Sequence, residues 1–249
     1  MKRLLRSLIV SLALLPALAG CGGSTAEPLP PPSDASLAAI KPKPGVDRQA
    51  LARRIDALFA KDAPGTTQAL IVMRGGEIVA ERYAQGFGPE TRFQGWSMSK
   101  TVTAVLIGLL VSEGRLRLDE SAPIPNWQRP GDPRGEITVR QLLQMRSGLR
   151  HVETADPPFN ADTVQLLFMD GRDDMAAQAE AEPLEAEPGR SFKYSTASSI
   201  ILSDIIARVL TDSKDPGTRR AAVDAFLHER LLHPLGLKSM VAEYDAAGT

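Results

Sequence analysis

The sequence is poor in the residues from which metal sites and disulfides are built. Its 249 residues include one cysteine and three histidines, His151, His228 and His233. No HExxH or CxxC spacing occurs, which argues against a zinc hydrolase. We therefore expect neither a metal ion nor a cofactor.

An excess of charge of one sign is also lacking. Lys and Arg number 29 against 30 Asp and Glu, the formal net charge is −1, and aromatic residues make up only 5%. Nucleic-acid-binding domains gather basic residues into a patch or stripe, and none stands out here, so no nucleic-acid partner is expected. The 43% of hydrophobic residues is enough for a sizeable core.

The first apolar run is too short to span a bilayer comfortably. It lies within residues 1–20, after three basic residues and before small ones, an order typical of a secretory signal peptide. The letters LAGC at residues 18–21 resemble the bacterial lipobox, which implies cleavage before Cys21 and acylation of its thiol. A plain signal peptide with a chance cysteine, or a short membrane anchor, remains open.

Acylation of Cys21 would tie the protein to a bacterial membrane, because several acyl chains on one residue hold it stably. Gly22 rather than an aspartate follows the cysteine. By analogy with lipoproteins, we expect a lipid-anchored protein on the periplasmic side of the cell envelope, at the outer membrane rather than the inner. Residues 21–45 contain six prolines among small polar residues and predict an extended tether.

Residues 46–249 are predicted to form one α+β domain. Asp47 predicts a helix N-cap, and QALIVMRGGEIVAERYAQGF predicts two strands joined at Gly75-Gly76. From Ser97 the pattern is helical and apolar nearly all round, which indicates a buried helix that ends at Gly114. We expect a mostly helical subdomain over about 97–222, with short helices from Thr138 to Gly148, near 163–169 and near 175–181, and further helices after Tyr194 and over 223–233.

Ser97 and Lys100 stand three positions apart at the start of the apolar helix. Residues at i and i+3 share a helix face, so the hydroxyl and the amine can meet. The positive end of the helix and burial both disfavour an ammonium group there. A neutral amine is the form that a general base requires, and a serine is a weak nucleophile until a base takes its proton. The alternative is a solvated first turn, since the four-residue spacing alone is common.

Tyr194 precedes a second amphipathic helix, about a hundred residues after Ser97. Most such tyrosines pack their ring and hydrogen-bond their hydroxyl. With Ser97 and Lys100 in this order, however, Tyr194 completes a recognisable set.

The sequence resembles the serine β-lactamase and penicillin-binding-protein superfamily. Within it, the sequence is most similar to the class C-like branch of esterases and 6-aminohexanoate-dimer hydrolases. The matching segments are ALIVMRGGEIVAERY, WSMSKTVTAVLIGLLVSEGRLRLDE, ITVRQLLQMRSGL, EPGRSFKYS and LLHPLGLKSM. Several segments in one order are far more specific than a four-residue motif.

The resemblance implies a β-lactamase/transpeptidase-like fold and a serine acyl-hydrolase. Ser97 would be the acylated nucleophile, Lys100 its base, and Tyr194 the group that relays a proton to the leaving group and later activates water. Thr196 stands where many relatives have an asparagine. Trp96 could wall the substrate pocket, and His151 could approach the cleft, although core packing and a surface loop, respectively, are the plainer expectations.

The resemblance has one gap. Relatives carry a third motif, Lys-Thr-Gly or His-x-Gly, well after the tyrosine, and nothing after Tyr194 matches it. We therefore expect a C-terminally truncated domain without its last strands and helix, which would lack half of its oxyanion hole and hydrolyse poorly.

Two other functions remain open. Gly95 to Ser99 nearly spells the G-x-S-x-G motif of α/β-hydrolases, with Asp204 and His228 following in order, but the fifth residue is serine and the alternation of strands and helices is missing. A non-catalytic sensor or scaffold that binds a peptide-like or β-lactam ligand would also fit the missing motif. In either enzymatic case the partner is a small-molecule or peptide-like acyl substrate.

Overall fold

A computed structural model describes residues 29–249. The chain divides into two compact units, Met1–Pro89 and Glu90–Thr249. The predicted signal peptide and Cys21 lie outside the described residues. Within the range that the structure describes, no helix is both long enough and apolar enough to cross a membrane.

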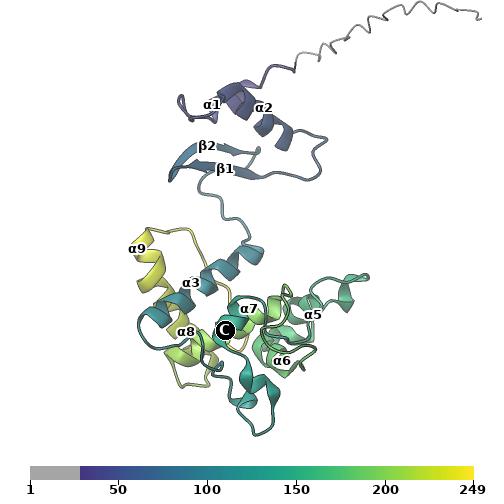
Figure 1. Cartoon of the computed structure of the whole chain (residues 1–249). Coiled ribbons are helices and arrows are strands. Elements are labelled where there is room, and N and C mark those ends of the chain that lie inside the picture. Colours follow the sequence, from purple (N-terminus) through teal and green to yellow (C-terminus); the bar gives the residue numbers. More distant parts are fainter. Residues whose placement is uncertain (1–28) are drawn as a thin grey trace, which may run out of the picture. The chain divides into compact units, whose positions relative to one another are not determined.

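The first unit combines two helices with a β-hairpin (Figure 1). A small core joins them through Ile40, Ala52, Ile55 and Ala80. The elements are α1 (Asp34–Ala38), α2 (Arg48–Leu58), β1 (Ala69–Arg74) and β2 (Glu77–Tyr83).

The N-cap and the hairpin of this unit are confirmed. The Asp47 side chain accepts hydrogen bonds from the first-turn amides of α2. β1 and β2 are antiparallel, with Ala69 opposite Tyr83, and both turn glycines have positive φ, 57° at Gly75 and 82° at Gly76. A two-residue turn that matches the twist of its strands requires this conformation.

The predicted tether is wrong over its second half. α1 lies inside it, Ser36 is fully buried, and Ile40 is 3% exposed and pairs with Ala80 of β2. The Lys41 amide donates to the Val79 carbonyl at 2.9 Å. The prolines gather before residue 33 and after residue 41, so the segment between them is free to form a helical turn and to bury its apolar side chains.

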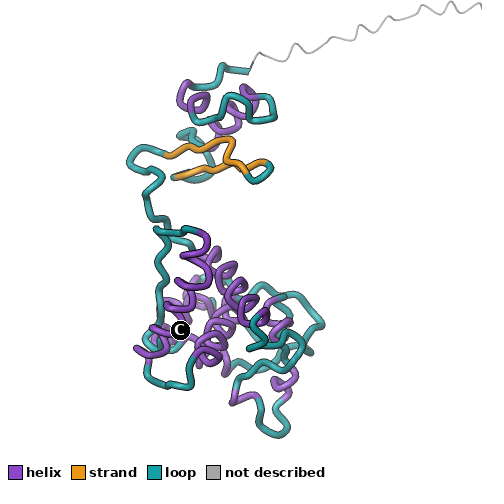
Figure 2. Tube along the Cα trace, turned by 90° about the vertical axis from the view of Figure 1, so that its left-hand side faces the viewer, coloured by secondary structure: helices purple, strands orange, loops and turns teal. Residues whose placement is uncertain are grey.

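The second unit consists of helices and irregular loops (Figure 2). The helices are α3 (Ser99–Ser112), α4 (Val139–Leu143), α5 (Asp162–Phe168), α6 (Met175–Ala181), α7 (Thr196–Leu210), α8 (Pro216–Leu227) and α9 (His233–Leu235). Single 3₁₀ turns occur at Trp96–Met98, Pro125–Trp127, Pro133–Glu136, Pro158–Asn160 and Asp170–Asp173, and a π-helical turn at His228–Leu232.

α7 forms the centre of this unit, and α3, α4, α6 and α8 pack against it (Figure 1). Its side chains Ile201 and Ile205 are fully buried, as is Trp127 from a loop. The Trp127 indole N–H donates to the Glu180 carbonyl at 2.9 Å, so the largest core side chain also satisfies its polar atom. Burial of these side chains holds the helices around α7.

α3 is less buried than its sequence predicts. Leu106, Ile107 and Leu110 face the core, whereas Val105 on the other side is exposed. The helix begins at Ser99, two residues later than expected, and ends as predicted before Gly114, whose φ is 71°. The hairpin and the helices together confirm the α+β class.

Candidate active site

Ser97 lies in the 3₁₀ turn that leads into α3. Trp96 before it has a φ of 44°, which is unusual for a bulky residue and is found preferentially at functional sites. The Ser99 hydroxyl donates to the Trp96 carbonyl at 2.8 Å and fixes the turn. As a result, the Ser97 hydroxyl is exposed and lies on the same side of the turn as Lys100.

Lys100 connects Ser97 to α7. Its Nζ lies 3.1 Å from the Ser97 Oγ and 3.1 Å from the Thr196 Oγ1. Both distances are within the range of a hydrogen bond. The structure therefore brings together the serine and the lysine that the sequence singles out, with Thr196 as a third member.

Tyr194 faces the same amine. The centre of its ring lies 5.3 Å from the Lys100 Nζ, within the range of a cation–π contact. The chain on each side of it is held by Met145, whose carbonyl accepts from the Lys193 amide at 2.8 Å and whose sulfur accepts from the Ser195 amide at 3.3 Å. Three predicted residues, Ser97, Thr196 and Tyr194, thus lie around the Lys100 amine.

Thr196 is the first residue of α7 and is buried. Its hydroxyl donates to Glu153 Oε1 at 2.6 Å, and its amide donates to Glu153 Oε2 at 2.8 Å. Sequence reasoning missed Glu153, because it lies in a loop without periodicity and 43 residues from its partner.

The Glu153 carboxylate is stabilised in its ionised form. Burial acts to raise its pKa, but the hydrogen bonds from the Thr196 hydroxyl and amide and from His151 outweigh it, so the pKa lies below its ordinary value. A carboxylate at the N-terminus of α7 is also favoured by the helix dipole.

His151 does not lie where it was expected. It is 1% exposed, neither in a surface loop nor on an open cleft, and its Nε2 lies 2.8 Å from Glu153 Oε2 and 3.2 Å from Thr163 Oγ1. Leu149 pairs with Leu184, and the Arg150 amide donates to the Pro183 carbonyl. This pairing places His151 behind Glu153, where it contacts the carboxylate.

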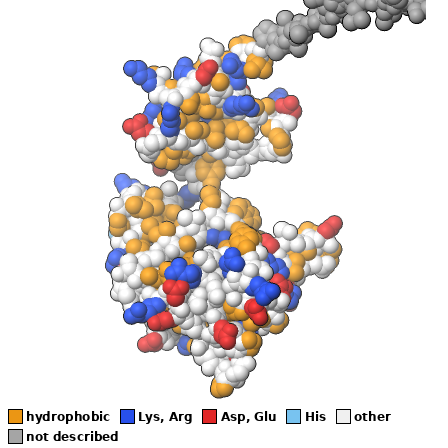
Figure 3. Space-filling model, viewed as in Figure 1, with side chains coloured by type: hydrophobic (Ala, Val, Ile, Leu, Met, Phe, Trp, Pro, Cys, Tyr) orange, Lys and Arg blue, Asp and Glu red, His pale blue; other side chains and the backbone are white. Residues whose placement is uncertain are grey.

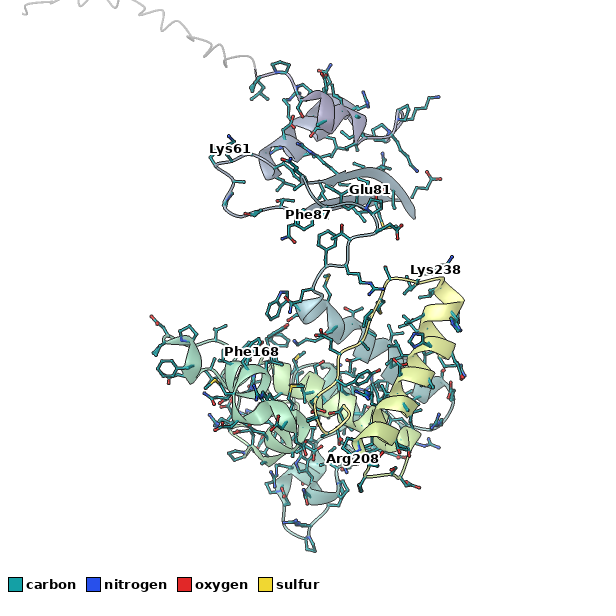
Figure 4. The ribbon with its side chains drawn as sticks, turned by 180° about the vertical axis from the view of Figure 1, so that it is seen from behind. Lys61, Glu81, Phe87, Phe168, Arg208 and Lys238 are labelled. Atoms are coloured by element: carbon teal, nitrogen blue, oxygen red, sulfur yellow. The ribbon has the colours of Figure 1, made fainter. Side chains whose placement is uncertain are left out.

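Trp96 is exposed rather than packed in the core. It is 61% exposed, and its ring makes an edge-on contact with Phe168 at the end of α5, with ring centres 6.5 Å apart. Phe168 is itself 55% exposed and is labelled in Figure 4. Hydrophobic side chains are visible elsewhere on the surface too (Figure 3), but Trp96 directly precedes Ser97 in the sequence.

A family model described as Beta-lactamase matches residues 48–248 of the chain. The chain belongs to the beta-lactamase family. This confirms the predicted superfamily and its fold. Ser97, Lys100, Tyr194 and Thr196 all lie inside the matched range.

The chain is also similar in sequence to individual curated proteins. The chain is 32% identical over 124 residues to the 6-aminohexanoate-dimer hydrolase of Paenarthrobacter ureafaciens, covering 49% of this chain and 31% of that protein. It is 24% identical over 180 residues to Protein flp of Staphylococcus aureus strain COL, covering 65% and 34%. The chain thus spans about a third of the length of the curated relatives it matches.

A solved structure supports the beta-lactamase fold. The crystal structure of a beta-lactamase-like protein from Bacteroides dorei DSM 17855 aligns with a TM-score of 0.51 and 22% identity. The alignment covers 72% of this chain and 50% of that one.

The α/β-hydrolase alternative is wrong. It conflicts with membership of the beta-lactamase family, and its acid is not free. Asp204 is buried in ion pairs with Arg208 and Arg219, and the His228 ring hydrogen-bonds the Asp224 carbonyl.

Proposed function

We propose that the protein is a serine acyl-hydrolase that cleaves an amide, ester or β-lactam bond through an acyl-enzyme. The observation that carries this proposal is the 3.1 Å distance between the Lys100 Nζ and the Ser97 Oγ. The family of the chain and the hydrolase among its relatives support it.

In the proposed acylation, Lys100 takes the Ser97 hydroxyl proton while the oxygen attacks the carbonyl carbon of the substrate. The backbone N–H of Ser97 donates to the oxyanion that forms. When the tetrahedral intermediate collapses, the bond to the leaving group breaks, and the leaving group receives a proton relayed by Tyr194. In deacylation, Tyr194 helps to activate a water molecule, which releases the acid and regenerates the hydroxyl.

The test is the hydrolysis of p-nitrophenyl esters, together with mass spectrometry of the acylated protein. Ser97→Ala should abolish acylation, and Lys100→Ala should slow it by about a hundredfold to ten-thousandfold. Ser99→Ala is the matched control, because its hydroxyl lies two residues away and donates to a backbone carbonyl. Acylation that survives Ser97→Ala would contradict the proposal.

The same assay separates the hydrolase from a sensor or scaffold. In a sensor of this family, Ser97 would be acylated slowly and stoichiometrically by an ester or a β-lactam. The acyl group would then stay on the protein, without further turnover. A hydrolase releases p-nitrophenol continuously after the initial burst.

We further propose that Cys21 is acylated and anchors the protein to the periplasmic side of the cell envelope. The support is the LAGC segment after an apolar run. Radiolabelled palmitate should enter the wild-type protein but not Cys21→Ser, and the variant should leave the membrane fraction. A membrane-bound, unlabelled wild-type protein would contradict acylation.

A further inference from the structure

We propose that Glu153 is a positioning residue of this site and acts on Lys100 through the Thr196 hydroxyl. Its effect on acylation rests on the proposed function, whereas its effect on Lys100 does not. Three contacts carry the proposal, and they join Glu153 to Thr196, Thr196 to Lys100, and Lys100 to Ser97.

The first contact fixes the direction of the second. An ionised carboxylate only accepts hydrogen bonds, and the Thr196 hydroxyl has one proton to donate. At 2.6 Å that proton lies between the Thr196 Oγ1 and Glu153 Oε1. The Thr196 oxygen must then accept a hydrogen bond from Lys100, so one N–H of the amine points away from Ser97.

This direction matters when Lys100 takes the serine proton. The amine becomes an ammonium group, and its positive charge faces a hydroxyl dipole aligned by the negative charge of Glu153. Charge-assisted hydrogen bonds of this kind are stronger than neutral ones. Glu153 therefore stabilises the ammonium group that acylation forms, without touching the substrate.

The carboxylate is held in place by other groups. Its second oxygen, Oε2, accepts from the Thr196 amide and lies 2.8 Å from His151 Nε2. The titratable groups around this chain of contacts are His151, which faces Glu153 from the loop before α5, and Tyr194, which faces Lys100 from the segment before α7. With both oxygens occupied, the carboxylate cannot turn away from Thr196.

The first experiment is a double-mutant cycle on the rate of Ser97 acylation by p-nitrophenyl acetate. In the limit of high pH, where the Lys100 amine is neutral in every variant, Glu153→Gln should slow acylation about tenfold. Thr196→Val should do the same, whereas Thr196→Ser should keep most of the rate. In the Thr196→Val background, Glu153→Gln should change the rate by less than about twofold. Glu187→Gln is the control, since it removes the same charge from an exposed pair with Arg190.

The second experiment follows Lys100 and needs no hydrolysis. In Ser97→Ala, trace acetylation by acetic anhydride at a series of pH values, read by mass spectrometry, reports when Lys100 becomes reactive. Glu153→Gln should move this midpoint to lower pH by about one pH unit, which corresponds to the tenfold change expected in the rate. The acetylation midpoints of Lys193 and Lys238, measured in the same samples, should not change.

The two experiments separate the possible failures. A wild-type protein that is never acylated overturns the proposed function, and the Lys100 midpoint still decides the role of Glu153. A Glu153→Gln protein with the wild-type midpoint overturns the positioning role. An equal loss of acylation rate on Glu153→Gln in the wild-type and Thr196→Val backgrounds would also overturn the positioning role. A purely structural residue would act independently of the threonine hydroxyl.

Discussion

At the scale of single residues, the aromatic pair beside Ser97 bears on the choice of substrate. Trp96 and Phe168 are exposed and contact each other edge-on. A substrate that covers this pair gains the free energy of removing apolar surface from water. Under the proposed function, we predict that this pair favours acyl groups with an apolar chain or ring.

Phe168→Ala should lower the preference for long acyl chains. We expect the ratio of kcat/KM for p-nitrophenyl octanoate to that for the acetate to fall about tenfold, because the lost ring contact affects only the longer chain. Phe159→Ala, in the 3₁₀ turn before α5, is the exposed control. An equal fall in kcat/KM for both esters would show that Phe168 does not discriminate between short and long acyl chains.

At the scale of elements, the ends of short helices are fixed by side chains. Thr138 and Gln141 form a capping box at the start of α4, in which each side chain bonds the backbone of the other. α4 has five residues and packs on α7. A helix this short depends on its cap and its packing rather than on intrinsic propensity.

Thr138→Ala should lower the free energy of unfolding by about 1 kcal/mol. The loss has a local cause, because the Gln141 amide would lose its acceptor. Urea denaturation followed by circular dichroism measures it, with Thr138→Ser as a control that keeps the cap. If the alanine and serine variants are equally stable, the cap contributes nothing.

Asp56 joins three elements of the first unit. It accepts from Ser33 and Ser36 around α1 and pairs with Arg82 of β2 at 2.9 Å. Burial opposes ionisation, but these hydrogen bonds dominate and lower its pKa to about 2.

The lowered pKa of Asp56 predicts an acid-sensitive unit. The stabilisation is fully present above the ordinary pKa of 3.8 and is lost as the pH falls toward 2. The protection factors of the β1 and β2 amides, which compare the measured exchange rate with the intrinsic rate at each pH, should fall in the wild type between pH 6 and pH 2. In Asp56→Asn, protection should be lower at pH 6 and change less with pH; an unchanged pH dependence would contradict this assignment.

At the scale of the whole molecule, a buried charge cluster joins α6, α7 and α8. Glu180 and Asp204 both pair with Arg208, and Asp204 also pairs with Arg219 (Figure 4 labels Arg208). Burial, with repulsion from Asp204, raises the pKa of Glu180 to about 8. We therefore predict that Glu180 is largely protonated in the folded protein at neutral pH.

Stability should fall as the pH rises from about 4.5 to about 8, because the folded state binds the Glu180 proton more tightly than the unfolded state does. Glu180→Gln mimics the protonated form and should flatten this fall. Calorimetric melting temperatures from pH 5 to pH 9 test it, with Glu187→Gln as the exposed control. The same decline in the variant would assign the pH dependence to other groups.

Much of the fold follows from local sequence signals. The Gly75-Gly76 turn, the Asp47 cap and the positions of α5, α6 and α7 are set by residues within a few positions, so pattern reasoning finds them. The exposed side of α3 and the pairing of residues 39–41 with β2 depend on contacts between residues far apart in the sequence, which periodicity does not predict.

The candidate site also combines residues that the sequence predicts with residues that it does not. The sequence predicts Ser97, Lys100 and Tyr194 because they stand in a recognisable order. Glu153 and the burial of His151 depend on pairing between residues 149–150 and 183–184, for which the sequence has no local mark.

The contact between Lys100 and Thr196 spans 96 positions of the chain. A polypeptide that leaves the ribosome with its N-terminus first presents the serine early and the threonine only after most of its length has emerged. Until then the Lys100 amine has no partner on α7. Under the proposed mechanism, we therefore expect newly made protein to be inactive until α7 has folded.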